Sequence, residues 1–227
     1  METFFVKNVS VVLCRCCATR RSNKVETKEQ ILKGAGELFL RYGLKSITMD
    51  EIARHLSISK KTLYIYFKDK DELLISFLEV YIAQLKDEMR NIFNISVDVI
   101  DEMLNTTVYM EKRICNINPS LLFDLKKYHF NAWNIFQLFK NSFIIKQIEE
   151  TLRKGIAEGY FRNDIDVKVL SRLRMEEVEM GFNPNVFNPE EYSIPKVQMQ
   201  LFEHFMYGIC TLKGHKKINQ YKQIIEE

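Results

Sequence analysis

The chain has 227 residues, 46% of them hydrophobic and 28% charged, which is the composition of a globular protein with a sizeable core. It contains only eight glycines and four prolines, and this scarcity argues against an all-β protein built on many tight turns. The net charge of +3 does not by itself indicate nucleic acid, although residues 1–72 carry 14 Lys and Arg against 9 Asp and Glu. No apolar run is long enough to cross a bilayer, so we expect no membrane partner.

Residues 1–23 show no periodic pattern, and we expect a disordered tail or an extension created by a wrongly assigned start codon. The segment lacks the basic stretch and the small-residue cleavage site of a signal peptide. The odd number of cysteines predicts no disulfide framework, and their spacing lacks the Cys/His pairs of a zinc site. We therefore expect a cytoplasmic protein without metal or cofactor. The five cysteines are Cys14, Cys16, Cys17, Cys115 and Cys210.

Residues 24–72 predict three helices in quick succession. The pattern Thr27 to Gln30 has the form of a capping box and predicts a helix start near Glu26, and Gly43 predicts its end. The apolar face of this helix consists of Ile31, Ala35, Leu38, Phe39 and Tyr42.

The second and third helices are short and are joined by the tight connection 57–59. Thr48 to Glu51 is another capping box, and Ser59 is placed to cap the third helix. Leu63 and Phe67 form the inner side of that third helix. Asp69 then precedes a fourth, long helix over residues 70–93, which leads out of the module.

Residues 73–227 also read as helices throughout, so we expect an all-α fold with a C-terminal helical bundle. Three of the four prolines fall in 183–195, the one irregular connection. Pro195 suits the first turn of a last long helix, which we expect to end near Gly214. The helices expected before this connection are 97–108, one opened by Pro119, 133–139, 143–159 and 167–181.

The stretch from Ile31 to Leu74 resembles the DNA-binding domain of the TetR/AcrR family. The matching elements are Ile52-Ala53, the run Thr62-Leu-Tyr-Ile-Tyr-Phe67 and the run Lys70-Asp-Glu-Leu73. One departure is Ser57, where the family usually has glycine. The resemblance implies an N-terminal helix-turn-helix domain over 24–72 and an effector-binding and dimerisation domain over 73–227.

By this resemblance, eight residues would contact double-stranded DNA. Thr48, Tyr64, Tyr66 and Lys70 would contact phosphates, and Lys60, Lys61, Thr62 and Ile65 would face the bases. Each also has a simpler interpretation: Tyr66 as core, the two lysines as solvated side chains, and Thr48 as a helix cap.

The stretch from Phe205 to His215 is similar to the ends of TetR-type regulators from Bacteroidetes-like bacteria, in which the last two long helices pair with their copies in a dimer. Two apolar stripes are candidates for that interface, although either stripe is also what an intrachain core requires. They consist of Val167, Leu170, Arg174 and Val178, and of Val197, Leu201, Phe205, Gly208 and Leu212.

The middle of the chain, about 95–165, would hold a small-molecule effector. Its candidate walls are Tyr109, Phe123, His129, Trp133, Phe136 and Phe139, all residue types that cores and pockets share. We find no phosphate loop, metalloprotease motif or nucleophile elbow, and His55, His129, His204 and His215 lack ligand spacing, so we do not expect an enzyme.

The sequence thus predicts a homodimeric repressor that leaves an inverted-repeat operator when a small molecule binds. Two alternatives stay open. One is an activator or co-repressed regulator with the same fold, and the other is a helical interaction protein that has lost DNA binding.

Overall fold

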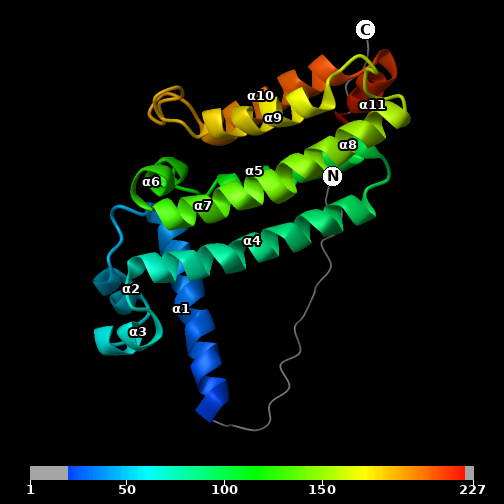
Figure 1. Cartoon of the computed structure of the whole chain (residues 1–227). Coiled ribbons are helices and arrows are strands. Elements are labelled where there is room, and N and C mark those ends of the chain that lie inside the picture. The colour runs from blue at the N-terminus through cyan, green and yellow to red at the C-terminus, as the bar shows by residue number, and fades with distance from the viewer. Residues whose placement is uncertain (1–19, 223–227) are drawn as a thin grey trace, which may run out of the picture.

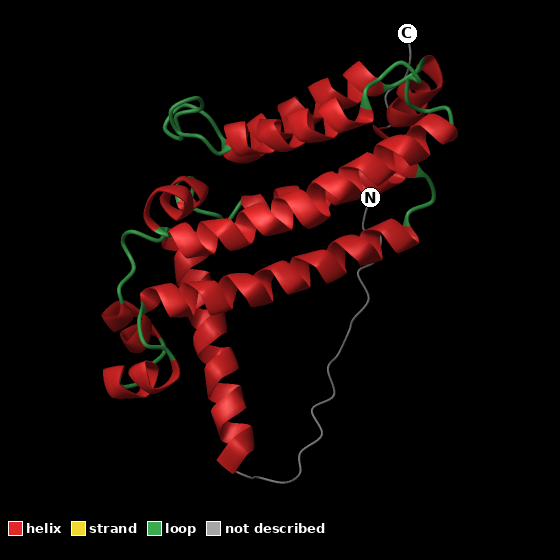
Figure 2. Ribbon diagram, in the orientation of Figure 1, coloured by secondary structure: helices red, strands yellow, loops and turns green. Residues whose placement is uncertain are grey.

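The computed structural model describes residues 20–222, and every regular element in this range is helical (Figure 2). The all-α prediction is therefore confirmed. No helix in this range is long and apolar enough to span a bilayer. The elements in chain order are α1 (Arg20–Tyr42), α2 (Met49–His55), α3 (Lys60–Tyr66), α4 (Lys70–Ile95), α5 (Val99–Ile114), α6 (Leu121–Tyr128), α7 (Phe130–Phe139), the π-helical turn η1 (Lys140–Ile144), α8 (Ile145–Ala157), α9 (Val167–Gly181), α10 (Ile194–Ile209) and α11 (Leu212–Lys222).

Helices α1, α2 and α3 form a head at one end of the molecule (Figure 1). The capping box at Thr48 forms as predicted: its hydroxyl accepts from the Glu51 amide, and the Glu51 carboxylate accepts from the Thr48 amide at 2.7 Å. Gly43 ends α1 with φ of +82°, a conformation that glycine adopts without strain. The predicted start near Glu26 is wrong, because α1 extends back to Arg20 and Thr27 lies inside it.

The helix α1 also crosses the predicted boundary between the N-terminal extension and the head. The rest of that extension, with Cys14, Cys16 and Cys17, lies outside the described residues.

The body is built in layers above α4 in the view of Figure 1. Helix α4 packs against α5 and α7, and the continuous rod of α7, η1 and α8 forms the next layer. Helices α9 and α10 lie side by side on top, α9 against α8 and α10 against α5. Helix α11 packs against α5 at the far end from the head.

The main buried side chains form two apolar clusters. The first joins the head to α4, α6 and α7, with Phe39, Leu63, Leu73 and Leu125 among its buried members. The second joins α5, α8, α10 and α11, and includes Ile100, Leu152, Phe202 and Ile218. The head thus shares one core with the nearer half of the body, while the farther half has its own.

The last helix ends earlier than the sequence indicated. Cys210 is extended (φ −76°, ψ 147°), and the Arg162 and Thr211 amides bond across to the carbonyls of Ile209 and Tyr160, each at 2.9 Å. The chain then begins the separate helix α11. Gly214, which we expected to end the helix, lies inside α11. A Cβ there would meet the Tyr160 carbonyl oxygen at 2.3 Å, so this glycine permits a close backbone approach.

The π-helical turn η1 buries a lysine between two layers. The Lys140 ammonium donates to Glu176 at 2.7 Å and to Glu179 at 2.6 Å, both on α9. Burial alone would lower the pKa of Lys140, but the hydrogen bonds to Glu176 and Glu179 and their charges outweigh it and raise the pKa. The turn therefore joins the α7–α8 rod to α9 through a buried ion pair.

Candidate nucleic-acid interface and ligand cavity

The turn between α2 and α3 fixes the direction of α3. Ser57 takes a φ of +54°, the left-handed conformation for which glycine is better suited, and the Ile58 amide bonds back to the Ala53 carbonyl. Ser59 then caps α3 by accepting from the Thr62 amide at 3.0 Å. Ser57, where the TetR/AcrR family usually has glycine, is thus the one described non-glycine residue with a positive φ. The turn forms with serine at this position.

One side of helix α3 is buried in the protein and the opposite side is exposed. Leu63 and Phe67 are buried in the head core, while Tyr64 and Ile65 are 50% and 62% exposed. Lys61 is also exposed, and its ammonium makes no ion pair within the described residues. The major groove of DNA presents hydrogen-bond acceptors, donors and thymine methyl groups. An outward face with a cation, a phenol and an aliphatic side chain can contact groups of these kinds.

The other predicted contact residues have partners within the protein. Lys60 forms an ion pair with Asp50 of α2, and the Thr62 hydroxyl lies 2.8 Å from that of Ser59. Tyr66 is half-buried against the head core, and Thr48 is exposed at the N-terminus of α2.

Lys70 also faces inward. Its ammonium donates to the Leu44 carbonyl and lies 6.0 Å from the centre of the Phe39 ring. Burial lowers the pKa of Lys70, although the charges of Asp71, Asp124 and Glu51 oppose that shift. Lys70 thus holds the start of α4 against the Leu44 carbonyl, and the phosphate contact predicted for it would be a second role.

A cavity of about 180 Å³ lies inside the body, between α4, α5, α8, α9 and α10. Five of the nine methionines of the chain line it, together with Phe93, Phe202 and branched aliphatic side chains. Methionine is flexible and polarisable, so such a wall adapts to ligands of different shapes. The five are Met89, Met103, Met110, Met175 and Met199.

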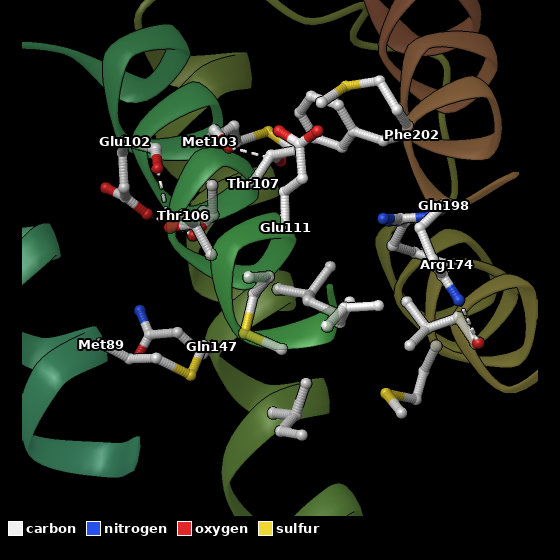
Figure 3. A pocket seen from close by; sticks show the side chains of 18 of the residues that line it. Met89, Glu102, Met103, Thr106, Thr107, Glu111, Gln147, Arg174, Gln198 and Phe202 are labelled. Carbon is white, nitrogen blue, oxygen red and sulfur yellow. Dashed lines mark hydrogen bonds between the residues drawn. The ribbon is translucent and has the colours of Figure 1, made fainter. Parts of the chain in front are cut away.

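Polar groups enter this wall at a few places. Figure 3 shows Glu102, Thr106 and Thr107 on the α5 side and Arg174, Gln198 and Phe202 on the α9 and α10 side. An apolar chamber with a small number of polar groups is the usual form of a small-molecule site.

Two of the charged groups in the wall are neutralised by the protein. The buried Glu102 carboxylate accepts from the Thr151 hydroxyl at 2.6 Å and from the Lys154 ammonium at 3.1 Å. The Arg174 guanidinium donates to Glu177 at 3.3 Å; burial lowers the pKa of Arg174, against the effect of Glu177.

None of the six predicted wall residues lines this cavity. Tyr109 hydrogen-bonds to Glu88 and Arg113, His129 lies 2.7 Å from Asp71, and Phe123 is exposed under Lys127. Trp133, Phe136 and Phe139 pack into the core that α7 shares with the head. Along the α7–α8 rod, the residues that reach the cavity are Ile144, Gln147, Ile148 and Thr151, which begin at η1.

The predicted dimer stripes mostly pack within the chain. Arg174 and Val178 line the cavity, Val167 and Leu170 pack against the second core, and Val197 and Phe205 are buried. Leu201 is half-buried, and Gly208 and Leu212 are exposed. These buried side chains make contacts within the chain, where α9 packs against α10, and their part in a dimer contact stays a prediction. The exposed apolar residues of α9 are instead Val169, Leu173 and Met180.

Comparison with known proteins finds a family match over part of the chain. Residues 31–77, which cover the whole of α2 and α3 with parts of α1 and α4, match the family described as bacterial regulatory proteins, tetR family. The chain is 36% identical over 95 residues to the uncharacterized HTH-type transcriptional regulator YvaF of Bacillus subtilis, a match that covers 41% of this chain and 50% of YvaF. The chain thus spans about half the length of this curated relative.

Two further proteins extend the likeness into the body. The HTH-type transcriptional repressor KstR2 of Mycolicibacterium smegmatis is 22% identical over 159 residues, which cover 67% of this chain and 76% of KstR2. The crystal structure of a TetR family transcriptional regulator from Agrobacterium tumefaciens has a TM-score of 0.70 and 13% identity, over 82% of this chain and 99% of that one. At that identity the structural likeness bears on the fold alone. Residues 31–77 thus match the tetR family of bacterial regulatory proteins, and the fold over 82% of the chain is similar to that of a TetR family regulator.

Proposed function

We propose that this protein is a homodimeric transcriptional repressor that binds an inverted-repeat operator and releases it when a small molecule enters the body cavity. The single observation that carries the proposal is the orientation of α3. Its inner side is buried in the head core, while Lys61, Tyr64 and Ile65 are exposed. Ser59 caps the start of α3, and Asp69 caps the start of α4, which follows it. Repression, as opposed to activation, is supported by the likeness to KstR2.

Among the predicted base-reading residues, the geometry favours Lys61. Its ammonium makes no ion pair in the described structure, whereas that of Lys60 is paired with Asp50 across the turn. A lysine that meets a guanine edge contributes on the order of 1–3 kcal/mol of discrimination, whereas a lysine on phosphate acts on every sequence alike.

A gel-shift titration tests the proposal directly. The full-length protein is titrated onto DNA from upstream of its own gene and onto random DNA of the same length, at several salt concentrations. Lys61→Ala should weaken operator binding about tenfold or more, with a much smaller loss on random DNA. Lys216→Ala, an exposed lysine of α11 at the far end from the head (Figure 1), is the matched control and should bind like the unaltered chain.

The same titration decides between the alternatives. Absence of sequence-specific binding in any salt would refute the repressor and favour a helical interaction protein. An equal loss for Lys61→Ala on both DNAs would make Lys61 a phosphate contact and remove it from the reading face. Lys70→Ala separates its two roles: loss of a phosphate contact lowers the salt slope by about one, whereas loss of the Leu44 contact lowers head stability.

The effector step would be a shift in the population of dimer states. A ligand in the cavity contacts α5, α8, α9 and α10, and α5 continues into the loop whose Asn118 amide bonds to the Leu40 carbonyl of α1 at 2.6 Å. A ligand that binds one arrangement of these helices more tightly shifts the equilibrium toward that arrangement and its spacing of the two heads. The free energy of that shift is at most the difference in binding free energy between the two arrangements.

A further inference from the structure

The charges around the body cavity do not cancel. Three ionisable side chains line it: Glu102, Glu111 and Arg174. Glu102 is paired with Lys154 and Arg174 with Glu177, as described above. Glu111 has neither an ion pair nor a side-chain hydrogen bond within the described residues. One negative charge in the wall is therefore left without a partner.

The cations nearest to Glu111 in the sequence are committed elsewhere. Arg113 donates to Glu88 of α4 at 2.7 Å and lies over the ring of Tyr81, so its guanidinium is held on the α4 side of α5. Lys112 is exposed and does not line the cavity. Glu111 itself is half-buried, in a wall made mostly of apolar side chains, five of them methionines. A carboxylate in such surroundings is less hydrated than one on the surface, so a positive charge brought close to it binds more strongly.

We infer that the cavity takes an apolar monocation, such as an aryl-alkyl ammonium, whose positive charge meets the Glu111 carboxylate and whose apolar part lies among the five methionines. This inference rests on the proposed function only in treating the cavity as the effector site. An anionic ligand would add a second unpaired negative charge near Glu102 and Glu111, and the one arginine in the wall already binds Glu177. A neutral ligand would leave Glu111 without a partner.

The size of the cavity fits a small ring-bearing compound better than a large drug. A buried apolar cavity of roughly 150 Å³ is enough to admit benzene in another protein, and this one is about 180 Å³. The flexible methionine side chains can enlarge it modestly without breaking the helices.

The test uses three probes that share one skeleton and differ in charge: 3-phenylpropylammonium, 3-phenylpropan-1-ol and 3-phenylpropanoate. Titration calorimetry with the full-length protein at neutral pH should rank the ammonium about tenfold tighter than the alcohol, and the carboxylate weakest, as a charge-assisted hydrogen bond predicts.

Glu111→Gln keeps the shape of the side chain and removes its charge. It should abolish the preference for the ammonium over the alcohol while leaving the affinity for the alcohol within about twofold of the unaltered chain. Glu150→Gln, an exposed carboxylate of α8 that does not line the cavity, is the matched control and should keep the full preference. Thermal unfolding of each variant establishes that it is folded.

Three results would overturn the inference: no binding of any probe at millimolar concentration, tightest binding of the carboxylate, or an ammonium preference that survives in Glu111→Gln. The proposed function fails by a different readout, namely the absence of specific DNA binding by the ligand-free protein. A chain that prefers the ammonium but binds no operator would keep the cation site and refute the repressor.

Discussion

Replacement of Lys140 by methionine tests whether the buried ion pair at η1 stabilises the body. Methionine retains most of the aliphatic length of lysine, so the change removes chiefly the ammonium and its bonds to Glu176 and Glu179. The Lys140 side chain is 8% exposed, that of Glu179 is 20% exposed and that of Glu176 is 64% exposed. After the change, Glu176 regains its hydration almost fully, whereas Glu179 does so only in part.

The expected loss follows from that asymmetry. Breaking a fully buried pair costs about 3–5 kcal/mol, because the remaining charge is stranded. Here one carboxylate reaches water and the other partly does, and the burial cost of the ammonium itself is relieved. We therefore expect Lys140→Met to lower the free energy of unfolding by about 1–2 kcal/mol. Glu179→Gln should cost about 1 kcal/mol, and Glu176→Gln less than about 0.5 kcal/mol.

Urea unfolding followed by circular dichroism measures these differences, and the m-value should stay unchanged. Because the pKa of Lys140 is raised above 10.5 in the folded state, its contribution is complete below pH 10.5 and is lost as the pH rises through the folded value. A Lys140→Met variant as stable as the unaltered chain at pH 7 would refute the reasoning. So would a larger loss for Glu176→Gln than for Glu179→Gln.

Three further outcomes follow from particular contacts. Gly155→Ala should lower the unfolding free energy by about 1–3 kcal/mol, because the new Cβ would lie 2.1 Å from the buried Phe161 ring; a melting temperature equal to that of the unaltered chain would contradict this. Iodoacetamide at pH 8 should modify Cys115 and spare Cys210 in the folded protein, because burial raises the pKa of the Cys210 thiol to about 12; peptide mass spectrometry that finds equal modification would be evidence against it. If the exposed apolar face of α9 is the dimer contact, light scattering should give about twice the 27.0 kDa chain mass, and Leu173→Glu should reduce it to one chain; a dimeric variant would place the interface elsewhere.

The sequence predicted the head well because local chemistry determines it. Thr48, Ser59 and Asp69 all cap the helices that they precede, and Gly43 ends α1, since each of these interactions involves residues within four positions. Leu63 and Phe67 are buried as the helical period indicated. The start of α1 was misplaced because Thr27 has the capping pattern but lies within a longer helix.

The cavity could not be predicted in the same way, because it depends on which helix faces meet. Aromatic side chains such as Trp133 and Phe139 serve the core equally well, and a π-helical turn changes the register after Phe139 without a sequence signal. The concentration of methionines in the body was a signal that could have been used, since five of them line the cavity. Arg174 and Val178 were assigned to the dimer stripe because one apolar stripe fits an internal and an external contact alike.

The cavity lies where the two cores of the chain meet. Leu85 and Met89 in its wall belong to the core that includes the head, while Phe202 opposite belongs to the core of α5, α8, α10 and α11. Because the two sides of this seam belong to different cores, local opening there should need less free energy than opening of either core. A bound molecule would fill the seam with van der Waals contacts to both halves, so that they would exchange amide hydrogens as one cooperative unit.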